Sequence, residues 1–349
     1  MDRMLQRCNT WDYCQRAIYM VTLTTEGRAP LFGQLVGGEA NPSVRKSPFG
    51  EIVAQCWADI PAHFPGVSII EAVVMPDHFH GILFIRRRQQ KSLGAIVGFL
   101  KAHSTSLFLR GASATAQNRL RPEQTADPRL PTCEQRCPVM VGDQLRPSAV
   151  LCPAACGGEG GFPRRLWAPG YHDRLLFQRG QLERLIAYVR DNPRRLAIKR
   201  AHPELFRVVR DLPLAGCTFS AIGNHFLLEQ SVRLALQCSR SISPEALAQQ
   251  QERFLALARQ GAVIISPCIS PGEKQIARAA LAAQLPLVVL LKNGFPPLYK
   301  PPQAYFEACA AGRLLMLSPW PYHPEKRPIT RAQCLTLNGF ARQLATTEG

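Results

Sequence analysis

The sequence of 349 residues predicts an α+β domain built on an antiparallel sheet, followed by an α/β domain built on a parallel sheet. Two β-prone segments, 67–75 and 78–85, are separated only by a Pro-Asp turn, which is typical of antiparallel neighbours. From about residue 215 onward, short apolar segments alternate with amphipathic ones, which is typical of a doubly wound sheet. A chain of this length has room for both domains.

The first domain is expected at residues 1–212. Its elements in order are a strand at 17–25, a helix at about 50–63, strands at 67–75 and 78–85, a helix at 92–109 and a helix around Tyr188. Two helices on one side of an antiparallel sheet predict a ferredoxin-like sandwich. Residues 111–163 are rich in Pro, Gly, Ala, Gln and Arg without periodicity, so we expect an insertion or flexible loop there.

The second domain is expected at residues 213–349. Its elements are strands at 231–238, 262–265, 287–291 and 313–317, with helices at 244–259 and 272–284. The turn 266–273 follows a strand and opens a helix, where backbone N–H groups favour an anion. Ser270, Gly272 and Lys300 are the candidate residues of this accessory anion site. An N-capped helix without a ligand is the alternative, and the lack of G-x-G-x-x-G argues against a dinucleotide.

The motif with the clearest chemistry is His78-Phe79-His80, inside an apolar, β-prone segment. Side chains alternate along a strand, so the two imidazoles share one face while Phe79 enters the other layer. Two imidazoles suit a divalent ion but do not fill its coordination shell. The motif therefore predicts a further ligand from elsewhere in the chain. A satisfied sheet histidine and a turn histidine are the alternative.

A helix near residues 181–193 offers the partner side chains. Leu182, Leu185, Ile186 and Val189 follow the helical period and put Tyr188 on a polar face with Arg184 and Asn192. Pro193 disfavours helical geometry at Asn192, so we expect the helix to end there with the carboxamide free to reach a metal. A surface tyrosine and a plain C-cap are the alternatives.

Four motifs in this order resemble the HUH single-strand endonucleases, and within them the single-tyrosine transposases associated with repetitive extragenic palindromes. The motifs are Arg16-Ala-Ile-Tyr-Met-Val-Thr-Leu-Thr24, Val74-Met-Pro-Asp-His-Phe-His80, Trp167-x-x-Gly-Tyr-His-Asp-Arg174 and Tyr188-x-x-x-Asn-Pro193. The resemblance covers roughly residues 10–205. One position departs from it, because Asp77 precedes the first His where the family often has Asn.

The resemblance implies a metal-dependent single-strand DNA endonuclease and strand transferase. Tyr188 would attack a phosphodiester and form a 5′-phosphotyrosine, and His78, His80 and Asn192 would hold Mg²⁺ or Mn²⁺. Single-stranded or hairpin DNA would be the partner. Two alternatives stay open: a hairpin-binding module without catalysis, and a nicking enzyme of the replication-initiator type. The second domain is similar, more weakly, to the Rossmann-like domain of the DNA-processing protein A family, which implies binding of nucleotide or DNA phosphate.

The charge of the chain agrees with a polyanionic partner. Lys and Arg total 42 against 25 Asp and Glu, a formal net charge of +17. Residues 161–210 contain twelve of these basic residues and four acidic ones. The candidate DNA-binding residues are Arg174, Arg184, Arg190, Arg194 and Arg195. A solvated basic face is the alternative.

Twelve cysteines in a chain without a secretory h-region are expected to be reduced thiols. Cys133-x-x-x-Cys137 and Cys152-x-x-x-Cys156 come closest to a zinc pattern, with looser spacing than zinc ribbons use. No apolar segment has transmembrane length. We therefore expect a cytoplasmic protein, a monomer or a homodimer, with no membrane partner.

Overall fold

The computed structural model describes residues 10–119, 165–296, 299–325 and 327–348. They form two compact units, 1–194 and 195–349, which divide inside helix α4. The expected division after residue 212 falls inside strand β7, Val209–Leu214. The two cysteine pairs expected to resemble a zinc pattern lie outside the described residues.

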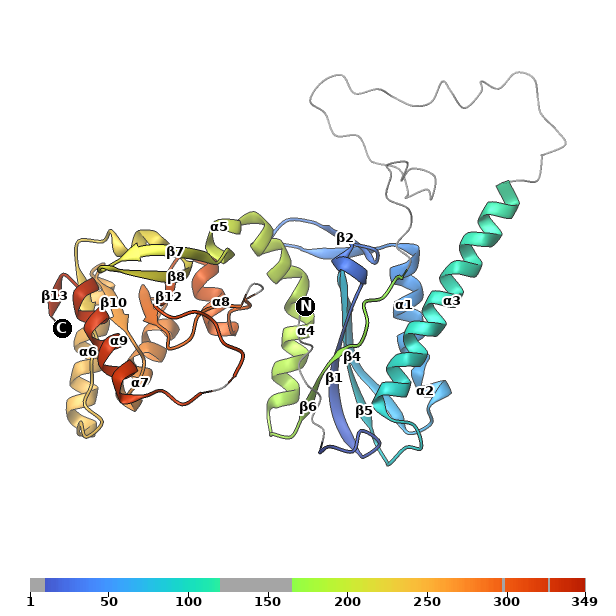
Figure 1. Ribbon diagram of the computed structural model, residues 1–349, viewed down its shortest axis with the longest axis horizontal. Helices are drawn as coiled ribbons and strands as arrows, with labels where there is room; N and C mark the ends of the chain where they lie inside the picture. The colour runs from blue at the N-terminus through green and yellow to red at the C-terminus, as the bar shows by residue number, and fades with distance from the viewer. Residues whose placement is uncertain (1–9, 120–164, 297–298, 326, 349) are drawn as a thin grey trace, which may run out of the picture. The chain divides into compact units, whose positions relative to one another are not determined.

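The first unit is built on a four-stranded antiparallel sheet with the order β4-β5-β1-β6 (Figure 1). Its strands are β1 Ala17–Thr24, β4 Val67–Val74, β5 His78–Ile85 and β6 His172–Leu176. Its helices are α1 Pro48–Ala58, α2 Ile60–His63, α3 Leu93–Arg119 and α4 Gln181–Ala201. A 3₁₀ turn, Glu26–Arg28, and a separate hairpin of β2 Gly33–Val36 and β3 Ser43–Lys46 lie between β1 and α1.

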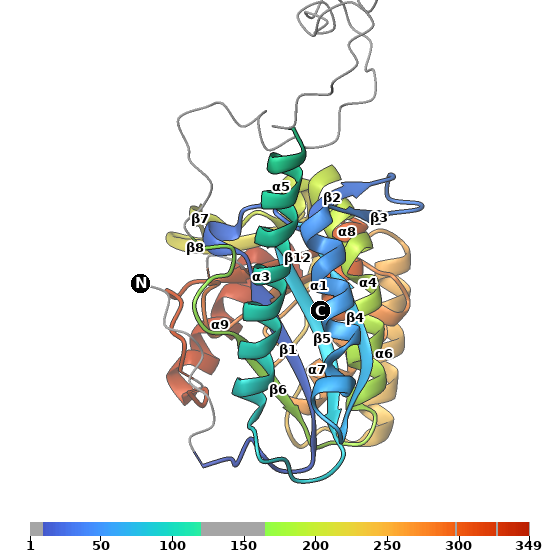
Figure 2. The ribbon, with the colours of Figure 1, turned by 90° about the vertical axis from the view of Figure 1, so that its right-hand side faces the viewer.

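Two crossovers account for this order. The chain from β1 to β4 passes through α1 and α2, and β5 lies between these two strands in the sheet. The chain from β5 to β6 passes through α3, and β1 lies between these two strands. Both crossovers place their helices on one face of the sheet, so the ferredoxin-like prediction is confirmed. In Figure 2, α1 and α3 lie in front of β1 and β5. Helix α4 packs on the opposite face.

The two faces of the sheet bury different side chains. Tyr19, Leu23 and Phe79 point into the core beneath α1 and α3, and all three are fully buried. Met20 and Ile82 alternate with them and pack against α4. Helix α3 continues to Arg119, so residues 111–119 are helical rather than part of a loop, and residues 120–164 lie outside the described residues.

The second unit is built on a seven-stranded sheet with the order β13-β9-β10-β11-β12-β8-β7. Five neighbouring strands, β13, β9, β10, β11 and β12, run parallel to one another. Strands β8 and β7 add an antiparallel edge next to β12. The strands are β7 Val209–Leu214, β8 Cys217–Gly223, β9 Arg233–Ala235, β10 Val263–Ser266, β11 Leu287–Leu290, β12 Leu314–Ser318 and β13 Thr347–Glu348. The helices are α5 Pro203–Phe206, α6 Pro244–Arg259, α7 Pro271–Ala282, α8 Gln303–Ala310 and α9 Arg331–Leu344, with a 3₁₀ turn at His225–Leu228.

Helices cover both faces of this second sheet. Phe254 of α6, Ile276 of α7 and Cys309 of α8 pack on one face, and Leu337 of α9 packs on the other. The α/β prediction is confirmed, including the parallel strands β9 to β12. The antiparallel hairpin of β7 and β8 was not predicted. Among the described residues, none of the helices is long and apolar enough to cross a membrane.

Candidate functional site

The two histidines of the His-x-His motif lie side by side on β5. His78 and His80 are 8% and 3% exposed, and their ring centroids are 4.8 Å apart. Phe79 points the other way and packs against Trp57 at 5.0 Å between ring centroids. The predicted sharing of one face is therefore confirmed. The strand alternation alone accounts for it.

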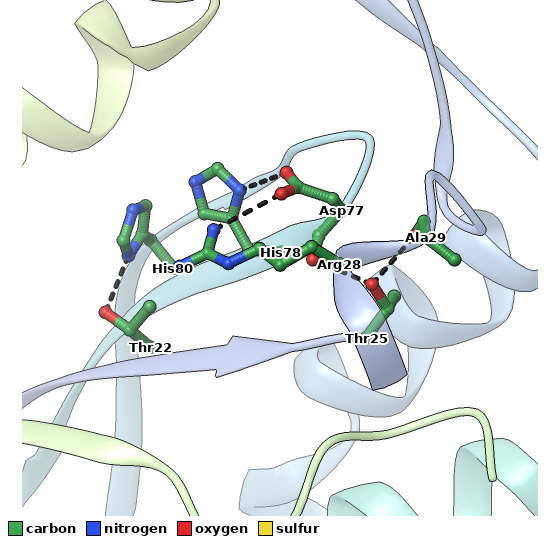
Figure 3. A network of polar contacts seen from close by, with 7 residues as sticks. All are labelled: Thr22, Thr25, Arg28, Ala29, Asp77, His78 and His80. Atoms are coloured by element: carbon green, nitrogen blue, oxygen red, sulfur yellow. Dashed lines mark hydrogen bonds and ion pairs between the residues drawn. The ribbon is translucent and has the colours of Figure 1, made fainter. Parts of the chain in front are cut away.

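Each imidazole is oriented through its Nδ1 atom (Figure 3). Thr22 Oγ1 lies 2.8 Å from His80 Nδ1, and Asp77 Oδ1 lies 2.6 Å from His78 Nδ1. Thr22 is the direct cross-strand neighbour of His80 on β1, which explains the first contact. Hydrogen bonds of this kind fix the ring orientation of metal-binding histidines and direct Nε2 toward the ion.

Asp77 is itself held in place by two neighbours. Arg28 Nη1 donates to its Oδ2 at 3.2 Å, and the Thr25 hydroxyl donates to its carbonyl oxygen at 3.0 Å (Figure 3). Burial alone would raise the pKa of Asp77, but the hydrogen bonds and positive charge of His78 and Arg28 lower it to about 2. A carboxylate at this position therefore stays ionised beside the His78 ring.

Tyr188 approaches the histidines from α4. Its ring centroid is 5.8 Å from that of His80, with the rings tilted by 62°. Leu185 and Val189 of the same helix are buried against Met20 and Ile82 of the sheet. This packing sets the position of the phenol relative to the imidazoles.

Two further contacts bear on this helix and its tyrosine. Arg190 of α4 forms an ion pair with Glu71 of β4, which lies opposite Ile82 on the same face of the sheet. Tyr19 and Tyr171, the other two tyrosines of the motifs, are buried in the core on the opposite face. Tyr188 is therefore the tyrosine of the motifs that lies beside the histidine pair.

The expectation that Pro193 ends the helix is wrong, because α4 continues through it to Ala201. Proline has no N–H, so the carbonyl of Val189 loses the donor it would have from residue 193. The Asn192 side chain replaces that donor: its Nδ2 donates to the carbonyls of Tyr188 at 2.6 Å and of Val189 at 3.4 Å. Asn192 is 6% exposed and does not reach outward. Only its carboxamide oxygen has the chemistry of a metal ligand.

No third His, Cys, Asp or Glu forms a metal-binding cluster with the histidine pair within the described part of the chain. The residues present still fit a divalent ion, because two imidazoles with anchored Nδ1 atoms are suitable nitrogen ligands. The remaining positions would be filled by oxygen atoms. Water and phosphate are oxygen ligands of this kind.

The five candidate arginines are distributed unevenly. Arg174 and Arg184 are exposed. Arg174, on β6, pairs with Met20 of β1, so its side chain lies on the sheet face that carries His80. Arg190 and Arg194 are in ion pairs with Glu71 and Asp191. These pairs lie on α4 itself or between α4 and the sheet.

Arg195 is not a surface residue, in contrast to its prediction as a DNA contact. It is 6% exposed, it donates to the Pro301 carbonyl and to Gln303 Oε1 at 2.9 Å each, and its guanidinium lies 3.8 Å from the centre of the Phe306 ring. A guanidinium that is stacked and bonded in this way stabilises the second unit.

The predicted accessory anion site is already occupied by a side chain of the protein. Ser270 caps α7, and the Glu273 carboxylate accepts from the backbone N–H groups of Ile269 at 2.6 Å and Ser270 at 3.2 Å. Its other oxygen accepts from the N–H of Cys238 at 3.3 Å. The donors expected to bind an external anion therefore bind Glu273, and the capped-helix alternative is correct.

Gly272 and Lys300 do not complete that anion site. A Cβ at Gly272 would lie 3.0 Å from Leu247 and 3.1 Å from Cys238, so this glycine allows close packing of α7. Lys300 lies near a different group, Lys199, whose pKa is lowered to about 8 mainly by burial and further by the charges of Lys300 and Arg195.

Sequence reasoning missed the residues that connect the Trp167 motif to helix α3. Trp167 Nε1 donates to Ser104 Oγ at 3.3 Å, and the Lys101 ammonium donates to the Ala168 carbonyl at 2.7 Å and to that of Gly170. Burial lowers the pKa of Lys101 to about 8, against the opposing charge of Glu26. These contacts hold the segment that leads into β6. A lysine and a serine three residues apart on an amphipathic helix give no sequence signal for that role.

Comparisons with known proteins give limited resemblance. No family model matches the chain. A relative from Haemophilus influenzae (strain ATCC 51907 / DSM 11121 / KW20 / Rd), described as an uncharacterized protein, is 30% identical over 115 residues, which are 33% of this chain and 60% of that protein. The chain thus spans less than two thirds of this relative.

Two solved structures are similar at low scores. One is a REP-associated tyrosine transposase bound to a REP hairpin, with a TM-score of 0.29 and 12% identity over 54% of this chain and 73% of that one. The other is the DNA processing protein A of Helicobacter pylori, described by its single-stranded DNA binding mode, with a TM-score of 0.31 and 19% identity over 40% of this chain and 66% of that one.

Proposed function

We propose that this protein is a metal-dependent endonuclease and strand transferase that acts on single-stranded or hairpin DNA through Tyr188. The observation that carries the proposal is the position of the Tyr188 ring, 5.8 Å from that of His80, which itself lies beside His78 on one sheet face. A nucleophile next to a pair of side chains that can bind a metal is an arrangement suited to phosphodiester cleavage. The net charge of +17 supports a polyanionic substrate.

In the proposed reaction the Tyr188 phenolic oxygen forms a bond to phosphorus while the bond from phosphorus to the 3′ oxygen breaks. The products are a 5′-phosphotyrosine and a free 3′-hydroxyl, and the phenolic proton leaves as the 3′ oxygen gains one. Mg²⁺ or Mn²⁺ bound by His78 and His80, with Asn192 as a further candidate ligand, would neutralise charge on a non-bridging phosphate oxygen. The number of phosphoester bonds is conserved, so the 3′-hydroxyl of another strand can reverse the reaction.

The protein's own contribution is mainly positioning. A phenol with an ordinary pKa of about 10 is a weak nucleophile at neutral pH, so its alignment with the phosphate matters greatly. Leu185 and Val189 hold α4 on the sheet, and Thr22 holds the His80 ring. The exposed Arg174 and Arg184 are the members of the predicted arginine set best placed to bind phosphate.

A covalent-adduct assay tests the proposal. Wild-type protein and Tyr188→Phe are incubated with 5′- and 3′-labelled hairpin-flanked single strands and Mn²⁺, then resolved on denaturing gels. For the wild type we expect an adduct that carries the 3′ label, because the protein is joined to the 5′ phosphate of the downstream fragment. For Tyr188→Phe we expect no adduct, with equal DNA affinity. Tyr322→Phe is the matched control, because Tyr322 is 42% exposed and lies in the second unit.

Two outcomes would contradict the proposal. An adduct that persists in Tyr188→Phe removes the nucleophile assignment, and full cleavage in EDTA removes the metal. Binding of hairpin DNA by a wild-type protein that forms no adduct under any of these conditions favours the hairpin-binding module instead. A nicking enzyme of the replication-initiator type would form the same adduct, and it differs by requiring a replication origin as its target.

A further inference from the structure

The end of the four-stranded sheet opposite the histidines carries a second basic surface. The segment before β1, the segment after β5 and the β6–α4 turn meet at this end (Figure 1). We call the surface formed by residues 11–16, 86–91 and 177–179 the basic end. Its exposed basic side chains are Arg16, Arg86, Arg87, Arg88, Lys91 and Arg179.

Contacts between the three segments hold the basic end together. Trp11 packs edge-on against Phe177 at 5.1 Å between ring centroids, and Asp12 pairs with Arg88 at 3.0 Å. Ala17 pairs with Ile85, and Ile18 pairs with Leu176, so β1 lies between the other two segments. Strands are spaced about 4.8 Å apart, which puts the backbones of the outer two segments within roughly 10 Å of each other.

The charge of this surface is strongly one-sided. Its three segments contain six basic residues and one acidic residue, Asp12. Arg86 and Arg87 also line a shallow hollow with Pro61, Pro65 and Gly66. Arginines concentrated around a hollow are suited to phosphate groups, because guanidinium groups bind phosphate oxygens in pairs.

An exposed aromatic ring indicates which polyanion fits. Phe177 is 68% exposed, although its edge is held by Trp11. A fixed aromatic ring among arginines offers a stacking surface for an unpaired base. A bilayer surface would instead favour an amphipathic helix with several apolar residues on one face, and these segments are connections between strands and helices.

We propose that the basic end binds an unpaired segment of the DNA strand whose scissile phosphate lies at the histidines; this inference rests on the proposed function. From His78 to Arg86 the strand rises eight residues, or about 26 Å at roughly 3.3 Å per residue. A bound strand that spans this distance contacts both ends of the sheet. A strand too short to span it contacts only one.

Oligonucleotide length separates the two contacts. Fluorescence anisotropy with labelled oligothymidylates of 4 and 40 nucleotides is measured in a Tyr188→Phe background, where no covalent step occurs. The test variant is Arg86→Ser/Arg87→Ser/Phe177→Ala. The control is Arg253→Ser/Arg259→Ser/Phe226→Ala, which removes the same charges and an equally exposed phenylalanine from the second unit.

We expect the test variant to bind the 40-mer at least tenfold more weakly than its parent and the control variant to change less than threefold. Loss of two phosphate contacts should also reduce the slope of log K against log salt by about 1.4. The single variant Phe177→Leu, which keeps an apolar side chain but removes the aromatic face, should lose affinity at unchanged salt slope. Circular dichroism of each variant reports folding.

Equal losses in the test and control variants, or no loss in the test variant, would overturn the basic end as a specific contact. This result is distinct from failure of the proposed function. If wild-type protein forms the adduct while the test variant binds the 40-mer normally, only the basic end is refuted. If no adduct forms but the test variant still loses affinity, the DNA contact is retained and the catalytic proposal is refuted.

Discussion

Replacing Asn192 by Ala separates two roles that this side chain can have. As a hydrogen-bond donor it satisfies the carbonyls of Tyr188 and Val189, the second of which lost its helical donor to Pro193. As a metal ligand it would use only its carboxamide oxygen. Leaving the Val189 carbonyl without a donor costs about 1–3 kcal/mol, so we expect Asn192→Ala to lower the free energy of unfolding by that amount even in EDTA.

A double-mutant cycle with Pro193→Ala supplies the control. Alanine at position 193 restores an N–H for the Val189 carbonyl and removes a helix-interior proline, which costs about 3 kcal/mol or more in an ordinary helix. In this background the cost of Asn192→Ala should fall below about 1 kcal/mol, because the orphaned carbonyl no longer exists. Urea denaturation followed by tryptophan fluorescence measures it. Three of the four tryptophans, Trp11, Trp57 and Trp167, lie in the first unit, and Trp320→Phe removes the fourth.

Equal cost of Asn192→Ala in both backgrounds would refute the carbonyl-capping role. The ligand role is tested in the same variants by adduct formation across a Mn²⁺ titration. If the carboxamide oxygen binds the ion, Asn192→Ala needs more Mn²⁺ even in the Pro193→Ala background, where its stability is restored. If the requirement for Mn²⁺ is unchanged there, Asn192 acts only on the helix.

Three further predictions concern other parts of the chain. Thr22→Val removes the hydrogen bond to His80 and should weaken Mn²⁺ binding 10- to 100-fold by calorimetry, while Thr24→Val on the same strand face should not. Glu273→Ala exposes three backbone donors and should destabilise the second unit by about 3 kcal/mol; phosphate should then raise its melting temperature, which it should not do for wild type. Burial lowers the pKa of His225 below 6.5. As pH falls, His225 is therefore protonated in the unfolded chain before it is protonated in the folded chain, and stability is lost below about pH 6.5. The difference between the denaturation midpoints at pH 7.5 and pH 5.5 should be smaller in His225→Phe than in the wild type.

Much of the first unit could be predicted because its strands are half-buried with strict alternation. Phe79 between His78 and His80 is such a case, since the period of two places each side chain without knowledge of the neighbours. The β7–β8 hairpin could not be predicted in the same way. Its first strand is largely exposed and contains Pro213 and a residue with positive φ, Asp211, so neither hydrophobicity nor propensity indicates a strand.

Two errors arise because a side chain close in sequence compensates for the local signal. Pro193 is a strong local signal for a helix end, and the helix continues because the Asn192 side chain supplies the missing donor. The helix N-terminus at Ser270 is a strong local signal for an anion, and the anion proved to be Glu273, three residues later in the same motif. In both cases the sequence identifies backbone groups that need a hydrogen-bond partner. The structure shows which side chain forms that hydrogen bond.

The arginines around Tyr188 show why local charge density does not locate a DNA-binding surface. Arg190 pairs with Glu71, and Arg195 is stacked on Phe306. A guanidinium already engaged with a carboxylate or a ring has less to gain from a phosphate, because binding must first break those contacts. These residues therefore fix the helix that carries Tyr188, and phosphate contacts are expected where arginines are exposed and not engaged in this way. Arg174 on the sheet face that carries His80, Arg184 on α4, and Arg86 and Arg87 at the basic end meet that condition.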